Sequence, residues 1–376
     1  MKKIGIFGGT FDPIHNAHLK IAAAARAQLG LDFVLMMTSG NPPHKQNKSI
    51  LDAKIRHIMV KRAVCCADGL VPFDFELNKD KPCYSSDTLA ELREKFPGDE
   101  LYFIIGGDSL RDFHTWHKPE EICRLCTLCV YMRGEPVDVG EVERRFGAKI
   151  KTIGGDFFDI SSSEIRSDPA NLRFCPDTVA EFIGKYRLYR DNGSPESFIR
   201  SVLPETRYRH SFGVAELAVR LGEIYGEDTK KLHLAGILHD IAKPIPHDEG
   251  LVMCDELEAE LDDIEWKIPP LLHAKLGAEL VKCYFGIREG DITSAIRHHT
   301  VGAPGMSRFD KIIFTADMCE ENRSFDGAAE IRATAFENID RACVMCIDAA
   351  ERFNRAKNNP VHPISAVLRD ELMRNL

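Results

Sequence analysis

The segment 5–18 constrains the fold of this chain more than any other stretch, because an apolar strand there ends in two glycines and runs straight into a helix. The glycines are Gly8 and Gly9, and the helix opens with the pair His15 and His18. Glycine at a strand end lets backbone N–H groups approach a phosphate, and the N-terminus of the next helix favours negative charge. Two imidazoles at this position can contact phosphates while charge builds up during group transfer. The segment therefore predicts a nucleotide site at the carboxyl edge of a parallel sheet.

The length of 376 residues predicts two domains, because a single core rarely grows that large. The apolar content of 44% and the charged content of 28% are typical of a soluble globular protein. No run approaches the ~18 apolar residues of a membrane helix. The start, Met1-Lys2-Lys3, leads into strand residues rather than into the apolar core of a signal peptide. We therefore expect a cytoplasmic protein without a membrane partner.

The net charge of −9 argues against a protein that binds nucleic acid through a general basic surface. Residues 191–376 carry the negative excess, whereas residues 1–190 are close to neutral. An acidic half could hold metal cations, although most acidic surfaces are simply solvated. Small-molecule nucleotides are the expected partners, and the sequence leaves open whether the chain forms a homo-oligomer.

Twelve cysteines in a chain without a secretion signal predict reduced thiols rather than a disulfide framework. The run Cys123-x-x-Cys126-x-x-Cys129 lies in an apolar stretch and lacks a second ligand pair at zinc spacing. We predict that these thiols, and those of Cys343 and Cys346, are buried and structural.

Strand-length apolar runs alternate with helical patterns in the first half of the chain. Such alternation predicts an α/β fold, a doubly wound, Rossmann-like parallel sheet that binds ligands at its carboxyl edge. The predicted strands are 3–7, 33–37, 71–75, 101–105 and 128–132, and the predicted helices are 18–29, 52–66, 86–95, 109–125, 138–146 and 176–186.

Helical periodicity replaces the strand signal in the second half. Turn and linker residues without periodicity occupy 191–196, which separates a first domain, 1–190, from an all-α second domain, 197–376. The predicted helices there are 212–225, 230–241, 274–285, 291–298, 310–320 and one long helix over about 327–357.

Further motifs in the first half each follow a predicted strand or open a predicted helix. Hydroxyls, a lysine, glycines and an arginine at these positions can all contact phosphates, and Ser161-x-x-Glu164 has the chemistry of a capping box. The motifs are Asn41-Pro42-Pro43-His44-Lys45, Tyr84-Ser85-Ser86-Asp87-Thr88-Leu89, Gly106-Gly107-Asp108-Ser109-Leu110 with Trp116 after it, and Ile160-Ser161-Ser162-Ser163-Glu164-Ile165-Arg166. A lone His-x-x-His or Gly-Gly is weak evidence, but five motifs in order at one sheet edge favour a site.

With these motifs, residues 1 to about 189 resemble the bacterial nicotinate mononucleotide adenylyltransferases of the nucleotidyltransferase superfamily. The family transfers AMP from ATP to nicotinate mononucleotide, which gives deamido-NAD and pyrophosphate. The resemblance implies Mg²⁺ and catalysis by positioning and charge stabilisation without a covalent intermediate. The family usually has glycine where this chain has Ala17, and the methyl group there could crowd the adenine.

The resemblance also implies roles for individual residues. Those implied for ATP are Gly8, Gly9, Thr10, Phe11, His15, His18, Lys45, Asp108, Ile160, Ser162, Ser163 and Arg166. Four of them, His15, His18, Lys45 and Arg166, take the catalytic role at the phosphates. Those implied for nicotinate mononucleotide are Tyr84, Thr88, Trp116 and again Lys45. His57 and His114 are expected to be ordinary helix residues.

The second half presents histidines and aspartates on, or at the ends of, several predicted helices. Imidazole and carboxylate are ligands that first-row transition metals accept, and helical bundles build metal sites from converging side chains. A bound metal makes water nucleophilic near neutral pH and absorbs charge at phosphorus. An isolated His-Asp pair is weak evidence, but His, His-Asp, His, His and Asp in this order resemble the HD phosphohydrolase superfamily. The flanking sequences, such as His-Asp-Ile-Ala-Lys at 239–243, are similar to those of its symmetrical diadenosine tetraphosphate hydrolases, which use iron and release two ADP.

This second resemblance implies two metal ions, with iron as the expected metal. One ion is held by His210, His239, Asp240 and Asp317, and the other by His273, His299 and the bridging Asp240. Lys243 is implied as a phosphate-binding catalytic cation, with Arg323 as a second. His298 is expected to flank the site, and His233, His247 and His362 are given no role.

Together the two halves predict a bifunctional enzyme, an adenylyltransferase of NAD biosynthesis joined to a metal-dependent phosphohydrolase. One alternative for the second half is a nucleotide-sensing module that binds metal without hydrolysis, and another is hydrolysis of a different nucleotide. The alternative for the first half is another small-molecule nucleotidyltransferase, such as a pantetheine-phosphate adenylyltransferase.

Overall fold

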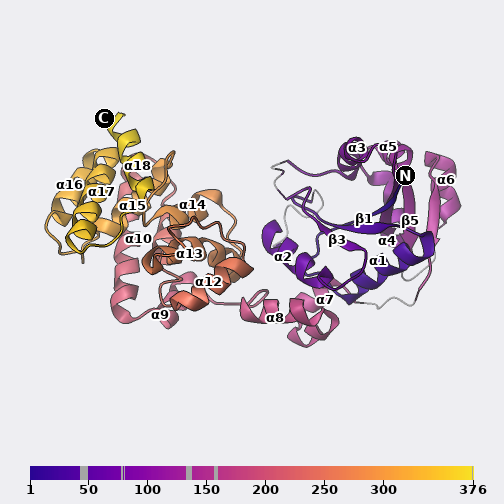
Figure 1. The fold of residues 1–376 in the computed structure, drawn as a ribbon, viewed down its shortest axis with the longest axis horizontal. Helices are drawn as coiled ribbons and strands as arrows, with labels where there is room; N and C mark the ends of the chain where they lie inside the picture. The colour runs from indigo at the N-terminus through magenta and orange to yellow at the C-terminus, as the bar shows by residue number, and fades with distance from the viewer. Residues whose placement is uncertain (43–49, 78, 80, 133–137, 156–159, 375) are drawn as a thin grey trace. The chain divides into compact units, whose positions relative to one another are not determined.

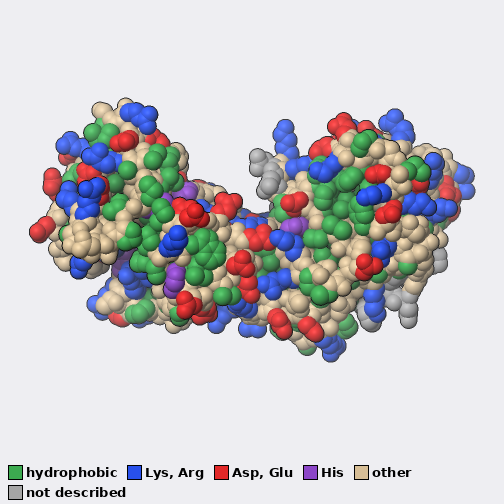
Figure 2. All heavy atoms as spheres, viewed as in Figure 1, with side chains coloured by type: hydrophobic (Ala, Val, Ile, Leu, Met, Phe, Trp, Pro, Cys, Tyr) green, Lys and Arg blue, Asp and Glu red, His purple; other side chains and the backbone are tan. Residues whose placement is uncertain are grey.

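The structure, a computed structural model, describes residues 1–42, 50–77, 79, 81–132, 138–155, 160–374 and 376. The chain divides into two compact units, Met1–Tyr189 and Arg190–Leu376, which are described separately. Among the described residues, no helix combines the length and the apolar character that crossing a bilayer requires. On the face drawn in Figure 2, basic and acidic side chains of the described residues are interspersed.

The first unit is built on a six-stranded sheet in which all neighbouring strands run parallel. The spatial order is β3-β2-β1-β4-β5-β6, so the direction of winding reverses between β1 and β4. The predicted doubly wound sheet is therefore confirmed. The strands are β1 (Lys3–Gly9), β2 (Phe33–Thr38), β3 (Leu70–Phe73), β4 (Glu100–Gly106), β5 (Thr127–Tyr131) and β6 (Ile150–Ile153).

Helices cover both faces of this sheet, as the apolar side chains on each face require. Ile4, Phe103 and Leu128 of the strands share a core with Leu92 of α3 and Ile122 of α5. Figure 1 shows α3 and α5 on one side of the sheet and α1 on the other. The helices are α1 (Asn16–Leu29), α2 (Ala53–Val64), α3 (Ser85–Lys95), α4 (Gly107–Arg111), α5 (Pro119–Leu125), α6 (Val139–Phe146), α7 (Ser162–Ser167) and α8 (Asp177–Lys185), with 3₁₀ turns at Phe113–Thr115 and Pro169–Phe174.

Most predicted elements of this unit agree with the structure within two residues, but two predictions are wrong. The helix predicted over 109–125 is broken, because Pro119 starts α5 and Lys118 before it has a φ of +49°. The strand β6 was not predicted, since it has four residues and its two central ones are exposed. The buried thiols are as expected: burial raises the pKa of Cys129 to about 12, so this thiol stays protonated.

The second unit is all-helical, as predicted, around one large apolar core. Its helices are α9 (Pro195–Val202), α10 (Glu205–Tyr225), α11 (Thr229–Leu238), α12 (His247–Glu256), α13 (Pro269–Phe285), α14 (Gly290–His298), α15 (Arg308–Cys319), α16 (Ala328–Glu337), α17 (Ile339–Ala356) and α18 (Pro363–Arg374).

The structure corrects several predicted element boundaries here. The helix predicted over 212–225 begins seven residues earlier, as α10, and the one predicted over 274–285 begins five residues earlier, as α13. The long helix predicted over 327–357 is two helices, because Asn338 leaves the helical conformation and caps α17 by accepting a hydrogen bond from the N–H of Arg341. The predicted linker ends early, since the Ser194 hydroxyl caps α9, which begins at Pro195. The helices α9, α12 and α18 were not predicted.

Close packing of α10 against α11 brings two predicted metal ligands together. A Cβ atom on Gly236 of α11 would lie 2.6 Å from the Cα of Ala215 in α10, so only glycine allows this approach. His210 lies earlier on α10 and His239 directly follows α11. The glycine therefore fixes the separation of the two imidazoles.

We predict that Gly236→Ala destabilises the second unit by about 1–3 kcal/mol, because the added methyl meets backbone atoms that cannot shift alone. Chemical denaturation would measure the loss. Gly290→Ala is the matched control, since a Cβ atom there meets nothing within 4 Å. Equal stability of the two variants would contradict the role assigned to Gly236.

Candidate functional sites

A cavity of about 600 Å³ opens at the carboxyl ends of β1 and β4, where the strand order reverses. Ligands of open α/β sheets bind at such a switch point. Six residues to which the sequence analysis gave a role line the cavity: Gly8, Gly9, Thr10, Tyr84, Thr88 and Trp116. Since Pro42 also lines it, the sheet edge brings together four of the five sequence motifs.

His15 and His18 lie beside this cavity at the start of α1, without forming part of its lining. His15 occupies the N-cap position, and the two imidazole rings stack with centroids 3.7 Å apart. The backbone N–H of His15 donates to Nδ1 of His18 at 3.2 Å. Because Nδ1 of His18 accepts, a neutral ring carries its proton on Nε2, which can then donate to an anion. Ala17 between them is buried and is not among the residues that line the cavity.

Arg166 is held against the loop after β1 by backbone and side-chain contacts. Its guanidinium donates to the carbonyl of Asp12 at 2.6 Å and to the hydroxyl of Ser163 at 3.2 Å. The hydroxyl of Ser162 donates to the Pro13 carbonyl at 2.9 Å. The start of α7 is therefore attached to the loop that carries the histidines, although Arg166, Ser162 and Ser163 do not line the cavity.

Tyr189, which the sequence analysis missed, helps to hold the loop after β1 in place. Its hydroxyl donates to Oδ1 of Asp12 at 2.9 Å, and burial raises the pKa of Tyr189 well above its usual value. Asp12 also lies 3.7 Å from the Arg166 guanidinium. The last residue of the first unit thus fixes the loop on which Arg166 rests.

Arg56 and Glu76 were also missed. Arg56 is 1% exposed and donates to the carbonyls of Leu51, Thr10 and Gly40, so it connects the segment before α2 to the loops that follow β1 and β2. Glu76 lines the cavity and accepts from the Thr88 hydroxyl at 2.7 Å, and burial raises its pKa. Arg56 is one of five basic residues in α2, so no pattern in the sequence distinguished it.

The remaining predicted residues of this site lie away from the cavity wall or cannot be placed. Phe11 packs its ring against His18 with centroids 5.1 Å apart, Asp108 is exposed on α4, and Ile160 is buried just before α7. Lys45 falls outside the described residues.

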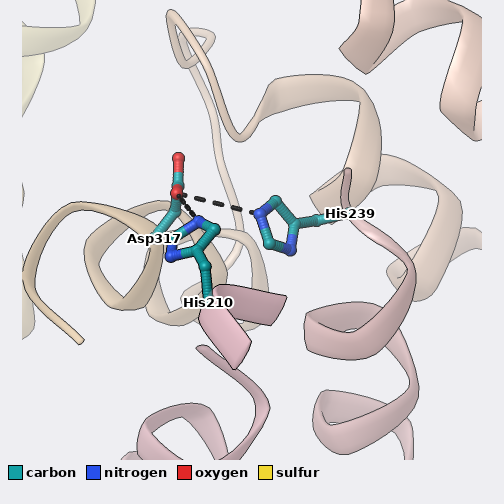
Figure 3. A group of neighbouring side chains, drawn as sticks. All are labelled: His210, His239 and Asp317. Carbon is teal, nitrogen blue, oxygen red and sulfur yellow. Dashed lines mark hydrogen bonds and ion pairs between the residues drawn. The ribbon is translucent and has the colours of Figure 1, made fainter. Parts of the chain in front are cut away.

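The second unit gathers all six predicted metal ligands into one cluster, supplied by α10, α13 and α15 and by the residues that end α11 and α14. Nε2 of His210 lies 2.9 Å from Oδ1 of Asp317, and Nε2 of His239 lies 3.7 Å from the same oxygen. Figure 3 shows these three side chains pointing toward one another from separate elements. The group is compact enough to surround one ion.

The other half of the cluster centres on Asp240. Its Oδ1 lies 3.1 Å from Nε2 of His273 and 3.8 Å from Nε2 of His299, and these two nitrogens are 3.0 Å apart. Its Oδ2 lies 3.7 Å from Nε2 of His239. Asp240 therefore touches both groups of imidazoles, the position that a bridging ligand requires.

Backbone carbonyls orient three of the imidazoles. Nδ1 of His239 lies 2.7 Å from the Gly236 carbonyl, and Nδ1 of His273 lies 2.8 Å from the Pro270 carbonyl. Nδ1 of His299 lies 2.7 Å from the Ile296 carbonyl. Donation from Nδ1 leaves a lone pair on Nε2, the atom that faces the cluster, and is the usual arrangement of metal-binding histidine.

This donor set fits a cation. Nε2 of His239 is buried and has no hydrogen-bond partner among the described residues, which is costly for a polar atom without a ligand. Nε2 of His273, Nε2 of His299 and Oδ1 of Asp240 are three acceptors that face one another. Lone pairs that face one another repel, and a cation bound between them would remove this repulsion. Imidazole and carboxylate accept iron, manganese, cobalt and zinc, so the residues do not select one metal.

The electrostatics keep the cluster ready for a metal. Burial, with the neighbouring His273 and His239, lowers the pKa of His299 to about 3, so this imidazole is neutral near pH 7. Burial opposes ionisation of Asp240, but the imidazoles around it hold its pKa well below the usual range. His299 and Asp240 are thus in the protonation states that metals bind. At His210 burial is outweighed by the carboxylates of Asp317 and Glu320, which raise its pKa, so a metal there would have to displace a proton more readily held.

Glu320, which the sequence analysis missed, contacts the metal-ligand cluster of the second unit through His210. Its Oε1 lies 3.1 Å from Nδ1 of His210, and its Oε2 accepts from the backbone and side-chain nitrogens of Asn322. A Cβ atom on Gly213 would collide with this carboxylate, so glycine there makes room for it. His210 alone among the four imidazoles is oriented by a carboxylate. The Asp-x-x-Glu spacing of 317 and 320 was the available signal.

Cationic side chains border the cluster on two sides. Arg323 lies 2.8 Å from Asp317, and Arg207, whose role the sequence did not indicate, lies 2.9 Å from Asp240. Both line a cavity of about 440 Å³ with Arg209 and His210. Lys243 lies 3.3 Å from Nε2 of His273, and burial lowers its pKa.

The other histidines lie outside the cluster. His298 is half-buried beside Ser294, His233 pairs with Glu196 at 3.5 Å, and His362 binds Asp262 at 2.8 Å.

Two family models match the chain, cytidylyltransferase-like over residues 6–168 and HD domain over residues 207–322. A Mycoplasma genitalium protein named "probable nicotinate-nucleotide adenylyltransferase/Ap4A hydrolase" is 30% identical over 88% of this chain and 91% of its own length. This chain belongs to that family. It consists of a nicotinate mononucleotide adenylyltransferase domain fused to an HD domain.

Other similar proteins match all or half of the chain. A Mycoplasma pneumoniae protein with the same name is 30% identical over 85% of this chain and 88% of its own. A Clostridium kluyveri protein named "probable nicotinate-nucleotide adenylyltransferase" is 38% identical over 50% of this chain and 100% of its own. A crystal structure from Clostridium acetobutylicum, titled "predicted HD superfamily hydrolase involved in NAD metabolism", is 37% identical over 48% of this chain and 96% of its own, with a TM-score of 0.47.

We predict that Glu320→Gln weakens metal binding by the HD domain by about 10- to 100-fold, because a neutral amide orients and polarises His210 less than a carboxylate does. Metal titration by calorimetry would measure it. Glu321→Gln is the matched control, since Glu321 is exposed and pairs with Arg220. Unchanged metal affinity of Glu320→Gln would contradict this role.

Proposed function

We propose that this chain is a bifunctional enzyme. The adenylyltransferase domain would transfer AMP from ATP to nicotinate mononucleotide, giving deamido-NAD and pyrophosphate. The HD domain would hydrolyse diadenosine tetraphosphate to two ADP with the help of metal. The observation that carries the proposal is that one unit has a cavity at the switch point of its sheet and the other has a cluster of possible metal ligands. The names of the Mycoplasma relatives, which join these two activities, support it.

For adenylyl transfer, the cavity at the switch point would hold the mononucleotide against Thr88 and Trp116. Its phosphate would attack the α-phosphorus of ATP, and pyrophosphate would leave in line. His18 can donate from Nε2 to the phosphates, and Arg166 is held ready by Asp12. Mg²⁺, when bound, would neutralise charge on the phosphates. These contacts would stabilise charge without a covalent intermediate.

The other residues assigned to this site are proposed in supporting places. Thr10 and the two loop glycines would approach the triphosphate through backbone N–H groups. Phe11, Asp108 and Ile160 would lie at the adenosine, Ser162, Ser163 and Lys45 at the β- and γ-phosphates, and Tyr84 at the mononucleotide.

For hydrolysis, His210, His239, Asp240 and Asp317 would hold one metal ion. His273 and His299, with Asp240 bridging, would hold a second. When bound, the metals would supply a nucleophilic water and Lewis-acid stabilisation of the phosphates. Iron is the proposed metal.

Three basic side chains would position the polyphosphate. Arg207 and Arg323 line the cavity next to His210, and Lys243 lies on the side of His273. Their positive charges would offset the developing charge on the bridging oxygens. Asp240 and Asp317 already pair with these two arginines. The substrate phosphates would therefore have to replace the carboxylates as partners of the guanidinium groups.

The substrates can be tested on the intact, metal-loaded chain. With ATP, we expect pyrophosphate release with nicotinate mononucleotide, and much less with nicotinamide mononucleotide or phosphopantetheine. With diadenosine tetraphosphate, we expect ADP alone on chromatography. Preference for phosphopantetheine would overturn the first assignment. Release of ATP and AMP would overturn the symmetrical cleavage, and intact metal without ADP release would favour a sensor.

Two substitutions test whether the sites are separate. His18→Ala should lower adenylyl transfer by about 10²-fold or more, because a donor to the reacting phosphates is lost, and should leave hydrolysis unchanged. Asp240→Ala should remove most metal, measured by elemental analysis, and leave adenylyl transfer unchanged. Loss of both activities in either variant would contradict separate sites.

A further inference from the structure

We propose that a cavity between α12 and α13 of the HD domain, here called the α12–α13 cavity, binds one nucleobase of the polyphosphate substrate. This inference rests on the proposed hydrolysis and assigns a binding site to a part of the fold that the family resemblance left without a role. The cavity has a volume of about 260 Å³. This lies just below the ~300 Å³ at which sites for whole drug-sized ligands begin, so it suits a single heterocycle.

The walls of the α12–α13 cavity are mainly apolar. Leu272 and Leu276 of α13 are buried, and Pro269, Pro270 and Ile245 stand at less buried positions around them. Flat apolar walls with few polar groups are typical of sites that bind aromatic heterocycles. The polar side chains of the lining are Lys243, His247 and His273.

The cavity is continuous with the catalytic cluster. Lys243 and His273 belong to its lining. The Lys243 ammonium lies 3.3 Å from Nε2 of His273, which in turn lies 3.1 Å from Asp240. A nucleoside bound in the α12–α13 cavity would therefore direct its phosphates past Lys243 toward the cluster.

His247 supplies a polar atom that a base could satisfy. It begins α12 and lines the cavity, and its Nδ1 is buried without a hydrogen-bond partner among the described residues. Because this nitrogen is closed off while the cavity is empty, a base would pair with it only after the imidazole ring turns toward the cavity. The ring nitrogens and exocyclic amine of adenine offer both a donor and acceptors.

The two sides of the cluster differ in chemistry. The cavity next to His210 is lined by Arg207, Arg209 and Arg323, whereas the α12–α13 cavity has one lysine and two histidines among otherwise apolar side chains. An apolar site on one side and a cationic site on the other favour a base in the first and phosphates in the second. On this model, only one of the two adenine bases of the substrate would bind in the α12–α13 cavity.

Two substitutions change this cavity without touching a metal ligand. Gly250→Ala places a methyl group 2.7 Å from Cδ2 of Leu272, at the far end of a flexible side chain, and so narrows the cavity. His247→Ala removes the unpaired nitrogen. The matched controls are Val252→Ala, which changes the exposed face of the same helix, and His233→Ala, which removes a histidine elsewhere.

Substrates with and without a base separate base recognition from hydrolysis. For diadenosine tetraphosphate, Gly250→Ala should raise KM about tenfold, which is the effect of a single methyl group in a complementary pocket. His247→Ala should also raise KM, because an imidazole is lost from the wall of the cavity. Hydrolysis of inorganic tetrapolyphosphate, metal content and the control variants should stay within twofold of the unsubstituted chain. Equal losses on both substrates, or no change with diadenosine tetraphosphate, would overturn the proposal.

Photolabelling tests the site even if neither substrate is hydrolysed, an outcome that would refute the proposed activity alone. Metal-loaded full chain would be irradiated with 8-azidoadenosine 5′-diphosphate, and the labelled peptides mapped. We expect label within 245–250 or 269–276, and its loss in Gly250→Ala. Label confined to the adenylyltransferase domain would overturn the proposal.

Discussion

The buried carboxylate of Asp240 is the feature on which the second site depends. It faces His239 through one oxygen and His273 and His299 through the other, and Arg207 reaches it from α10. Burying an ion and several acceptors together costs several kcal/mol unless positive charge compensates. The same helices that supply these ligands form the apolar core of the domain. Packing of the core therefore also positions the metal-ligand side chains, so a substitution that shifts one of these helices would also shift the ligands it carries.

The adenylyltransferase domain handles phosphate by different means. Its candidate site includes the loop after β1, which two side chains hold in place. Arg56 donates to the Thr10 carbonyl, and Tyr189 donates to the Asp12 carboxylate. None of these contacts needs to touch substrate. In the proposed reaction they would hold N–H groups, an imidazole donor and Arg166 in place before the nucleotide arrives, so little reorganisation would remain for the reaction itself. The HD domain differs, because its site is a cluster of imidazoles and carboxylates that could hold metal ions.

The sequence was sufficient for features that are local or periodic. Strand-length apolar runs and the glycines that follow them predict the sheet and its binding edge, and His239-Asp240 with the spaced histidines predicts the helical metal cluster. It was insufficient for contacts between distant residues. Glu320 and His210 are 110 positions apart, and Tyr189 and Asp12 are 177 apart, so no pattern within one element indicates either pair. Local breaks such as Lys118-Pro119 were misjudged because apolar periodicity continued across them.

The fusion joins two phosphate chemistries that would conflict within one pocket. Asp240, Asp317 and Glu320 place three carboxylates around the HD cluster, and without metal these would repel a polyphosphate. The loop of the other site would attract phosphate through donors and cations, and two carboxylates near it have partners, Asp12 in Arg166 and Tyr189, and Glu76 in Thr88. Every described residue of the first site lies in 1–189, and every ligand of the second in 190–376. Because no side chain serves both, each site can keep the electrostatics its reaction requires.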